Sequence, residues 1–249
     1  MQNRYVGDLG DFAKYALLRG FVGPEAFKLG IVWCLFHDET HNGDGRHTRY
    51  LTRNDYRELD RDLHDALAKI VQSGKRSVHK IPRAGLFPAD TIFFEQPIAT
   101  GTSRHLVSRH DRELFRINWL SQALAATSEC EIVFFDPDNG LEIPSVSKYQ
   151  PKAGKYIFLN ELRDFWKRGQ SLIVYHHLNR TATVRDQTDI LRRRLSVNFS
   201  DAAVVNSLLF RGGSCRHFWI IGQRSHKVKL HRRIEAIMNS GWRMHFEIC

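Results

Sequence analysis

Three short runs of almost uninterrupted apolar residues stand out along the chain, and each has the length of a single β-strand. They cover residues 28–36, 131–135 and 171–177. Strands without polar alternation are typical of a parallel sheet that is covered on both faces. Stretches with apolar residues at helical spacing lie between them. The pattern predicts helices at 11–21, 54–73, 107–127, 158–168, 184–195 and 226–239, further strands at 90–94 and 242–248, and a hairpin at 201–222.

This alternation of strands and helices predicts an α/β fold with a mostly parallel sheet and helices on both of its faces. The hairpin, which turns at RGGS, adds antiparallel strands at one edge. Asp11 and Asn54 are expected to cap the first two helices. Because the chain has no internal repeat and no linker rich in Pro, Gly or Ser, we expect residues 1–249 to form a single domain.

The net charge of the chain is +10, which favours a polyanionic partner such as nucleic acid. A basic surface that is simply solvated remains the alternative. The basic residues gather at 180–194 and 224–233, where both segments are predicted as helices with one exposed basic face.

The apolar runs are too short to span a bilayer, and no secretory signal is visible at the N-terminus, so we expect no membrane association. The four cysteines lie far apart, without a CxxC pair. Cys34 and Cys215 fall in apolar runs and are expected to be buried thiols in a reducing compartment. The sequence therefore predicts a cytoplasmic protein.

The carboxyl ends of three predicted strands are each followed by a polar segment. In open α/β sheets, ligands bind in the crevice beyond those ends. The turns that carry Gly43, Asp136 and His176 are therefore expected to converge on a common pocket at one rim of the sheet. The three segments are THNGDGR at 40–46, DPDNGLE at 136–142 and YHHLNR at 175–180.

The first two segments carry residue types that suit a ligand. Gly43 and Gly45 allow a tight turn and keep side chains away from a bound molecule, although glycines also serve turns that bind nothing. Asp136, at the end of a buried strand, is expected to project its carboxylate into the crevice. Asp138 and Asn139 are turn formers, but two aspartates so close together also suit a cation, a proton acceptor or a hydrogen-bonded amine.

Two further features are less specific. His176 and His177 end a strand and are expected to face opposite sides of the sheet, so a shared metal site is disfavoured. Lys14 lies on the apolar face of the first helix beside Tyr15. It is expected either to pair with an anion or to extend along the helix to water.

Taken in order, these segments resemble those of the bacterial ribosomal RNA adenine-N6 methyltransferase J family, a branch of the S-adenosylmethionine-dependent methyltransferases. GDLGDFAKY at 7–15 occupies the place of that family's N-terminal motif, with Asp11 and Lys14 matching. The cofactor loop of the family reads Thr-His-Ala-Gly-Ala-Gly-Arg, and this chain matches it at Thr40, His41, Gly43, Gly45 and Arg46. The catalytic loop of the family is Asp-Pro-Pro-Tyr-Glu, for which this chain has DPDNGLE.

The resemblance implies a Rossmann-like methyltransferase fold with a C-terminal antiparallel hairpin, and S-adenosylmethionine as cofactor. It implies that Lys14 pairs with the cofactor carboxylate, that the backbone at Gly43 and Gly45 accommodates the methionine part, and that Glu95 binds the ribose hydroxyls. Asp136 would accept hydrogen bonds from the target amine, within a catalytic loop that includes Asp138 and Asn139. The substrate would be RNA or DNA.

Two other functions are compatible with the same residues. Asp138 and Asn139 replace the second proline and the tyrosine of the family's catalytic loop, and the tyrosine forms the wall on which a flipped adenine stacks. Asp44, Asp136 and Asp138, with or without His41, could instead hold Mg²⁺ or Mn²⁺ in a metal-dependent nuclease or phosphohydrolase. A degenerate methyltransferase fold that only binds nucleic acid or a protein partner is the third hypothesis.

Overall fold

The structure, a computed structural model, describes residues 1–23, 26–39, 43–98 and 108–249. Its central feature is a seven-stranded sheet, to which a separate sheet of two very short strands is added. The strands of the large sheet are β1 (Leu29–Trp33), β2 (Ile92–Phe94), β3 (Ile132–Asp136), β6 (Ser171–His177), β7 (Val204–Phe210), β8 (Arg216–Gly222) and β9 (Phe246–Ile248), and those of the small sheet are β4 (Gly140–Leu141) and β5 (Tyr156–Ile157).

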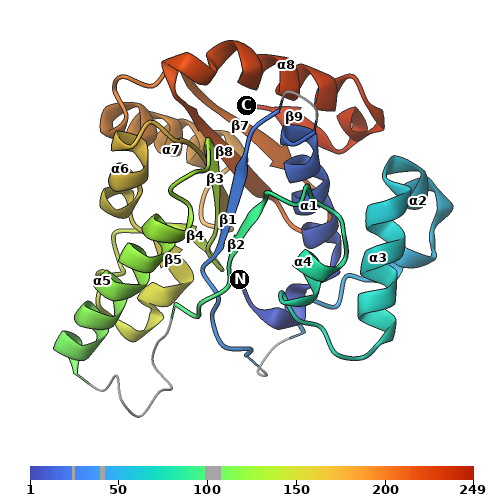
Figure 1. Cartoon of the computed structure of the whole chain (residues 1–249), viewed down its shortest axis with the longest axis horizontal. Coiled ribbons are helices and arrows are strands. Elements are labelled where there is room, and N and C mark those ends of the chain that lie inside the picture. The colour runs from blue at the N-terminus through green and yellow to red at the C-terminus, as the bar shows by residue number, and fades with distance from the viewer. Residues whose placement is uncertain (24–25, 40–42, 99–107) are drawn as a thin grey trace.

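The order of strands in the large sheet is β2-β1-β3-β6-β8-β7-β9 (Figure 1). The first four strands are parallel to one another. β8 is antiparallel to both β6 and β7, and β9 is antiparallel to β7. The C-terminal hairpin is therefore inserted with its second strand against the parallel part of the sheet. This arrangement confirms the predicted α/β fold with antiparallel strands at one edge.

Helices cover both faces of the sheet, as the apolar strands predict (Figure 1). One face packs against α1, α3 and α8, and the other packs against α5, α6 and α7. The helices are α1 (Leu9–Phe21), α2 (Asn54–Leu59), α3 (Arg61–Gln72), α4 (Lys80–Arg83), α5 (Arg109–Ala126), α6 (Leu159–Lys167), α7 (Val184–Asn198) and α8 (Lys227–Met238), with 3₁₀ turns η1 (Asn3–Tyr5), η2 (Arg49–Thr52), η3 (Pro151–Lys155), η4 (Arg224–His226) and η5 (Gly241–Met244).

Side-chain alternation along β3 decides where its last residue points. Ile132 and Phe134 belong to the core on the α1 side, and Val133 and Phe135 belong to the core on the side of α5, α6 and α7. Because successive side chains of a strand point to opposite faces, Asp136 lies on the α1 side. The same alternation places Tyr175 and His177 on the α1 side and His176 on the other side. The two histidines therefore face opposite sides of the sheet, as predicted.

Five local predictions need correction. Asp8, not Asp11, caps α1, and its carboxylate accepts a hydrogen bond from the Asp11 amide at 2.8 Å. The helix predicted at 54–73 is two helices, because the extended backbone of Asp60 ends α2 and the side chain of Asp60 caps α3. Asn54 is the first residue of α2 and not its cap. The last strand begins at Phe246 rather than at residue 242. Cys34 is buried as predicted, but Cys215 is only half-buried.

Among the described residues, no helix is both long enough and apolar enough to cross a membrane.

Candidate active site at the carboxyl ends of the strands

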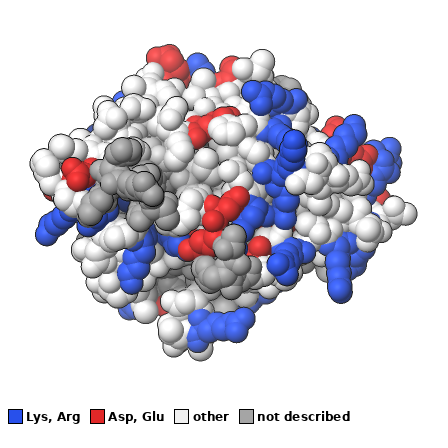
Figure 2. Space-filling view, turned by 90° about the horizontal axis from the view of Figure 1, so that it is seen from below, with Lys and Arg blue, Asp and Glu red and all other residues white. Residues whose placement is uncertain are grey.

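A polar cavity of about 300 Å³ lies at the rim where β1, β3 and β6 end. Its walls come from η1, the N-terminal turns of α1, the glycine loop after β1, the DPDN turn after β3, the end of β6 and the turn between β7 and β8. Segments far apart in the sequence therefore meet there, as expected from the strand order. Figure 2 views this end of the molecule, where acidic side chains gather near the middle and Lys and Arg side chains lie around them.

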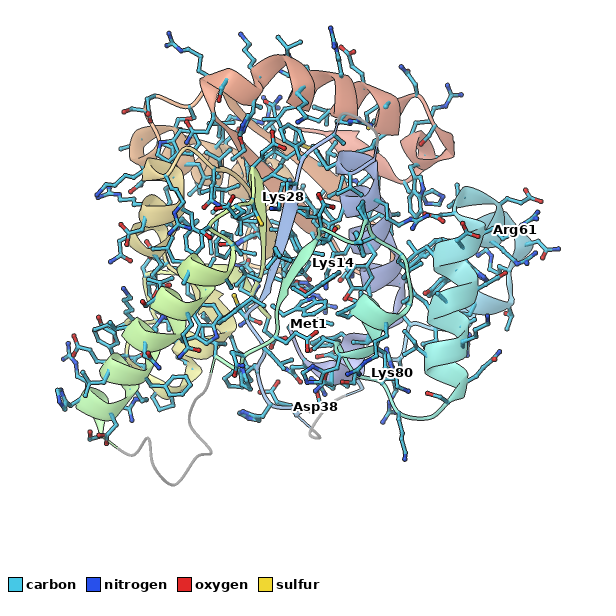
Figure 3. The ribbon with its side chains drawn as sticks, viewed as in Figure 1. Met1, Lys14, Lys28, Asp38, Arg61 and Lys80 are labelled. Atoms are coloured by element: carbon cyan, nitrogen blue, oxygen red, sulfur yellow. The ribbon has the colours of Figure 1, made fainter. Side chains whose placement is uncertain are left out.

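A buried ion triplet forms one wall of the cavity. The ammonium of Lys14 contacts Oδ2 of Asp136 at 2.7 Å and Oδ1 of Asp11 at 2.5 Å. All three side chains are at most 4% exposed. Figure 3 shows Lys14 in the interior of the molecule, in contrast to Arg61 and Lys80 at the periphery. The anion that pairs with Lys14 in the structure is therefore the catalytic candidate Asp136 itself, together with Asp11.

Burial and pairing act in opposite directions on these charges. Burial opposes the positive charge of Lys14, but the carboxylates of Asp11 and Asp136 outweigh it and raise the pKa of the lysine. Burial raises the pKa of the Asp11 carboxyl, and the lysine only partly offsets this. Lys14 is therefore charged at neutral pH, and its charge compensates that of Asp136.

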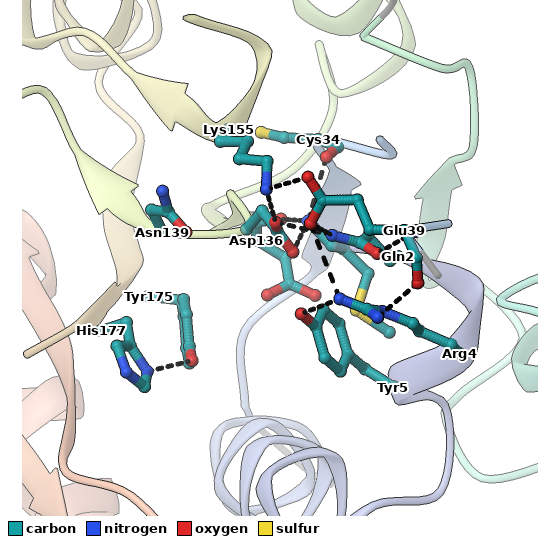
Figure 4. Close-up of polar contacts among 12 residues, drawn as sticks. Gln2, Arg4, Tyr5, Cys34, Glu39, Asp136, Asn139, Lys155, Tyr175 and His177 are labelled. Atoms are coloured by element: carbon teal, nitrogen blue, oxygen red, sulfur yellow. Dashed lines mark hydrogen bonds and ion pairs between the residues drawn. The ribbon is translucent and has the colours of Figure 1, made fainter. Parts of the chain in front are cut away.

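One oxygen of Asp136 remains open to the cavity. Lys14 donates to Oδ2, and no group in the described part of the chain donates to Oδ1. Asp136 lines the cavity although its residue exposure is only 1%. Tyr5 and Tyr175 line the same cavity as Asp136 (Figure 4). The site thus presents a hydrogen-bond acceptor in a cavity that two aromatic side chains also line.

Asp138, in the DPDN turn, has partners of its own. Its Oδ2 accepts from Gln2 at 2.9 Å and lies 3.5 Å from the ammonium of Lys155. Its Oδ1 is buried without a hydrogen-bond partner in the described structure, 3.9 Å from the amino group of Met1. Lys155 also contacts Glu39 at 2.5 Å (Figure 4). Asp138 therefore lies among three positively charged or hydrogen-bond-donating groups, and its buried Oδ1 accepts no hydrogen bond in the described structure.

The DPDN turn is fixed by the neighbouring strands. The main-chain oxygen of Asn139 accepts from the amide of His177 at 3.0 Å, and its side chain donates to the hydroxyl of Tyr156 at 2.9 Å. Gly140 has a φ of +121°, and a Cβ there would lie 2.4 Å from Nδ1 of His176. His176 in turn accepts from the amide of Leu141 at 3.0 Å. His176 is thus a structural support for the turn.

The glycine loop contributes Gly45 but not Gly43 to the cavity. Gly45 is buried, with a φ of +80°, and a Cβ there would lie 2.5 Å from the main-chain oxygen of Arg4. Arg76 donates to the carbonyl of Gly45 at 2.5 Å. Gly43 and Arg46 are exposed and do not line the cavity. The remaining predicted cofactor residues of this loop, Thr40 and His41, lie outside the described residues.

Glu95 lies at the same rim but not in the cavity. It follows β2, it is half-buried, and its carboxylate contacts Nδ1 of His79. Of the predicted site residues, the structure therefore brings together five in one cavity and leaves three others outside it. Those inside are Lys14, Gly45, Asp136, Asp138 and Asn139, and those outside are Gly43, Arg46 and Glu95.

The cavity also contains residues that the sequence analysis did not single out, among them Tyr5, Tyr175 and Arg216. Tyr175 lies next to Lys14, whose ammonium is 5.7 Å from the ring centre. Arg216 follows the RGGS turn and was not among the predicted site residues. The sequence did indicate its position, because Arg216 lies two residues before Phe218 on the same strand and so faces the same side. Phe218 and Ile220 face the core beneath α1.

The carboxylates proposed for a metal are each occupied by a cation. Asp136 contacts Lys14, Asp138 lies close to Lys155, and the exposed Asp44 lies 3.8 Å from Arg4. The described residues contain no group of three or more His, Cys, Asp or Glu side chains arranged to hold a metal ion. A divalent cation would have to displace the buried ammonium of Lys14 and the half-buried ammonium of Lys155 to bind both Asp136 and Asp138.

Comparison with known proteins adds no relative, since no protein-family model, curated protein or solved structure matches the chain.

Proposed function

We propose that this protein is an S-adenosylmethionine-dependent methyltransferase that acts on an amino group of a nucleic acid. The observation that carries the proposal is the open Oδ1 of Asp136, a buried carboxylate at the end of a central strand whose other oxygen is neutralised by Lys14. A carboxylate in this state accepts a hydrogen bond from an N–H group. The fold with its inserted C-terminal hairpin agrees with the Rossmann-like methyltransferase architecture that the resemblance implies.

The residues of the cavity suit the cationic end of S-adenosylmethionine. Its sulfonium and ammonium groups are positive, and the lining of the cavity includes the carboxylates of Asp44 and Asp138. Gly45 keeps the wall free of a side chain at the loop that follows β1. A volume of about 300 Å³ is at the lower end of the range of ligand pockets, so the adenosine end would extend along the rim toward β2 and Glu95.

The contribution of Asp136 to the reaction is to orient the acceptor. The bound cofactor supplies an electrophilic methyl group. The carbon–sulfur bond electrons of the cofactor would remain on sulfur, and the Asp136 carboxylate would hold the acceptor nitrogen with its lone pair directed at that methyl group. The proton lost from nitrogen passes to the Asp136 carboxylate or to water. Such transfer needs mainly positioning, which can contribute roughly 7–11 kcal/mol to lowering the barrier.

Tyr5 and Tyr175 offer a replacement for the tyrosine that the DPDN turn lacks. Both line the cavity together with Asp136 (Figure 4). An aromatic ring beside the acceptor carboxylate is a surface on which an unstacked base can pack. The net charge of +10 supports a nucleic acid rather than a small neutral molecule as the carrier of that base.

Binding and transfer test the proposal separately. We expect S-adenosylmethionine to give a binding heat in calorimetry, and Mg²⁺ or Mn²⁺ to give none that depends on Asp136. The variant Asp136→Asn should keep cofactor affinity within about threefold and lose about 10²-fold or more in transfer of labelled methyl to RNA or DNA.

The control is the same substitution at Asp189, which is half-buried on α7 and paired with Arg192, and which should leave transfer unchanged. A binding heat for metal that disappears in Asp136→Asn, with none for the cofactor, would instead support the hydrolase. Absence of both heats, with nucleic acid still bound, would support the binding module.

A further inference from the structure

Arg216 is a buried cation without a counter-ion in the described part of the structure. It is the first residue of β8, it is 7% exposed, and it lines the cavity. Its Nη2 donates to Oγ of Ser214 at 2.5 Å and to the carbonyl of Gly212 at 3.4 Å. Among the described residues, no acceptor contacts its Nε or Nη1, and no carboxylate lies within 4 Å. A buried charge of this kind requires an anion.

The guanidinium lies against the N-terminal turn of α1. A Cβ built on Gly10 would lie 1.5 Å from Nη1 of Arg216, so that only glycine leaves room for it. The Leu9 amide donates to His47, and the Asp11 amide donates to Asp8. The Gly10 amide has no acceptor in the described structure. It is therefore a free helix N-terminal donor, and such donors bind anions.

Three donors of different kinds thus meet at one side of the cavity. They are the guanidinium of Arg216, the amide of Gly10 and the hydroxyl of Ser214, whose oxygen already accepts from Arg216 and whose proton is free to donate. His177, the cross-strand neighbour of Arg216, and Arg180 line the same side. A set of separate donors around one point suits a tetrahedral phosphate, which presents several acceptor oxygens.

The position in the sheet indicates which molecule carries the phosphate. The cofactor loop follows β1, Asp136 ends β3, and Arg216 begins β8, so that Asp136 lies between the two along the order β1-β3-β6-β8. Two strand spacings separate β3 from β8, or about 10 Å. This is close to the length of a nucleoside from the amino group of its base to its phosphate.

We propose that Gly10, Ser214 and Arg216 bind a phosphate group of the acceptor nucleotide and so place its base amine at Asp136. The phosphate site itself stands on the geometry of Arg216 and α1, whereas its assignment to the acceptor rests on the proposed function. Such a contact positions the substrate without reading its sequence.

Nucleotide binding tests the site without any turnover. In calorimetry we expect nucleoside 5′-monophosphates to bind at least tenfold more tightly than the corresponding nucleosides, and inorganic phosphate to compete. Arg216→Met should abolish this preference. Gly10→Ala should do the same by displacing the guanidinium, while the helical backbone at residue 10 tolerates alanine. A dinucleoside monophosphate, measured in parallel, distinguishes a phosphodiester from a terminal phosphate as the natural ligand.

The matched control is Arg211→Met, which removes an exposed arginine of the same turn that pairs with Glu247. It should keep the preference for the phosphorylated ligand. Equal binding of nucleosides and nucleotides, or a preference that survives in both Arg216→Met and Gly10→Ala, would overturn the inference.

Cofactor titrations of the same variants separate this inference from the proposed function. If Arg216→Met lowers the affinity for S-adenosylmethionine and phosphate does not bind to the unmodified protein, Arg216 binds the cofactor carboxylate and the inference is wrong. If phosphate binds through Arg216 but S-adenosylmethionine gives no heat, the phosphate site stands and the methyltransferase proposal fails.

Discussion

At the scale of single residues, the site depends on pairings that the sequence does not display. Lys14 and Asp136 are 122 positions apart and form a 2.7 Å contact because α1 packs over the face of the sheet to which Asp136 points. Alternation in β3 predicts the face of Asp136, but a single helix turn does not reveal that Lys14 meets it. Sequence reasoning therefore found both residues and assigned Lys14 to a cofactor carboxylate, whereas here it pairs with the carboxylates of the protein.

The two glycines of the loop after β1 offer a prediction at this scale. Gly45→Ala should lower the free energy of unfolding by about 1–3 kcal/mol, because alanine is strained at a φ of +80° and its Cβ would meet the carbonyl of Arg4. Gly43→Ala should change it by less than about 0.5 kcal/mol, since the nearest atom to its Cβ would be 3.7 Å away. Urea denaturation of both variants measures this difference. Equal stability losses would show that the loop does not have this backbone conformation.

At the scale of elements, strong periodicity predicts the bounds of strands and helices well, but it does not reveal segments of only two residues. The strands at 131–135 and 171–177 and the helix at 184–195 lie within a few residues of their predicted bounds. β4 and β5 have two residues each, too few for any period to be visible, yet they fix the DPDN turn. The break at Asp60 was also hidden, because the apolar spacing continues across it.

A buried ion pair between α5 and α6 also supports the DPDN turn, through its contacts with the small sheet. Arg116 contacts both oxygens of Glu161, at 2.5 and 2.8 Å, and donates to the carbonyls of Ala153 and Tyr156 beside β5. Glu161 in turn accepts from the amide of Phe158 at 2.9 Å. The pair therefore connects two helices to the small sheet that carries the turn.

Glu161→Gln should destabilise the protein by about 3–5 kcal/mol, because it leaves the buried guanidinium of Arg116 without its counter-charge. It should also speed hydrogen exchange at the Asn139 amide, which donates to Lys155 just before β5. The same substitution at Glu247, in the exposed pair with Arg211, should cost less than about 1 kcal/mol. If both variants lose the same small amount, the Arg116 pair contributes no more than a surface pair.

At the scale of the whole molecule, the two faces of the sheet carry different polar groups. The α1 side ends in the charged cavity, whereas the opposite side holds two buried histidines as neutral hydrogen-bonding groups. His176 accepts from Leu141, and His217 lies between the hydroxyls of Ser207 and Thr188 at 2.9 and 2.8 Å. The α/β class and the site rim were predictable from pattern alone. Which polar groups lie on which face was not predictable, because it depends on which helix covers each face.

Acid should destabilise the whole fold through these histidines. Burial lowers the pKa of His176 to about 3 and that of His217 to about 4, so below pH 6.5 the unfolded chain binds more protons and stability falls as pH falls. Each group contributes about 2 kcal/mol between pH 6.5 and 5. Asp11, whose pKa is raised, acts in the opposite direction, so that the net loss from these three groups should be about 2 kcal/mol.

Urea denaturation at pH 7 and at pH 5 measures this loss, and His217→Gln isolates one contributor. The variant should have a smaller stability difference between the two pH values than the unmodified protein, by about 2 kcal/mol, whatever its stability at pH 7. His231→Gln, at an exposed position on α8, should leave the difference unchanged. If His217→Gln and His231→Gln behave alike, His217 is not held neutral by the fold, and the hydrogen-bond chain from Ser207 to Thr188 does not control the response to acid.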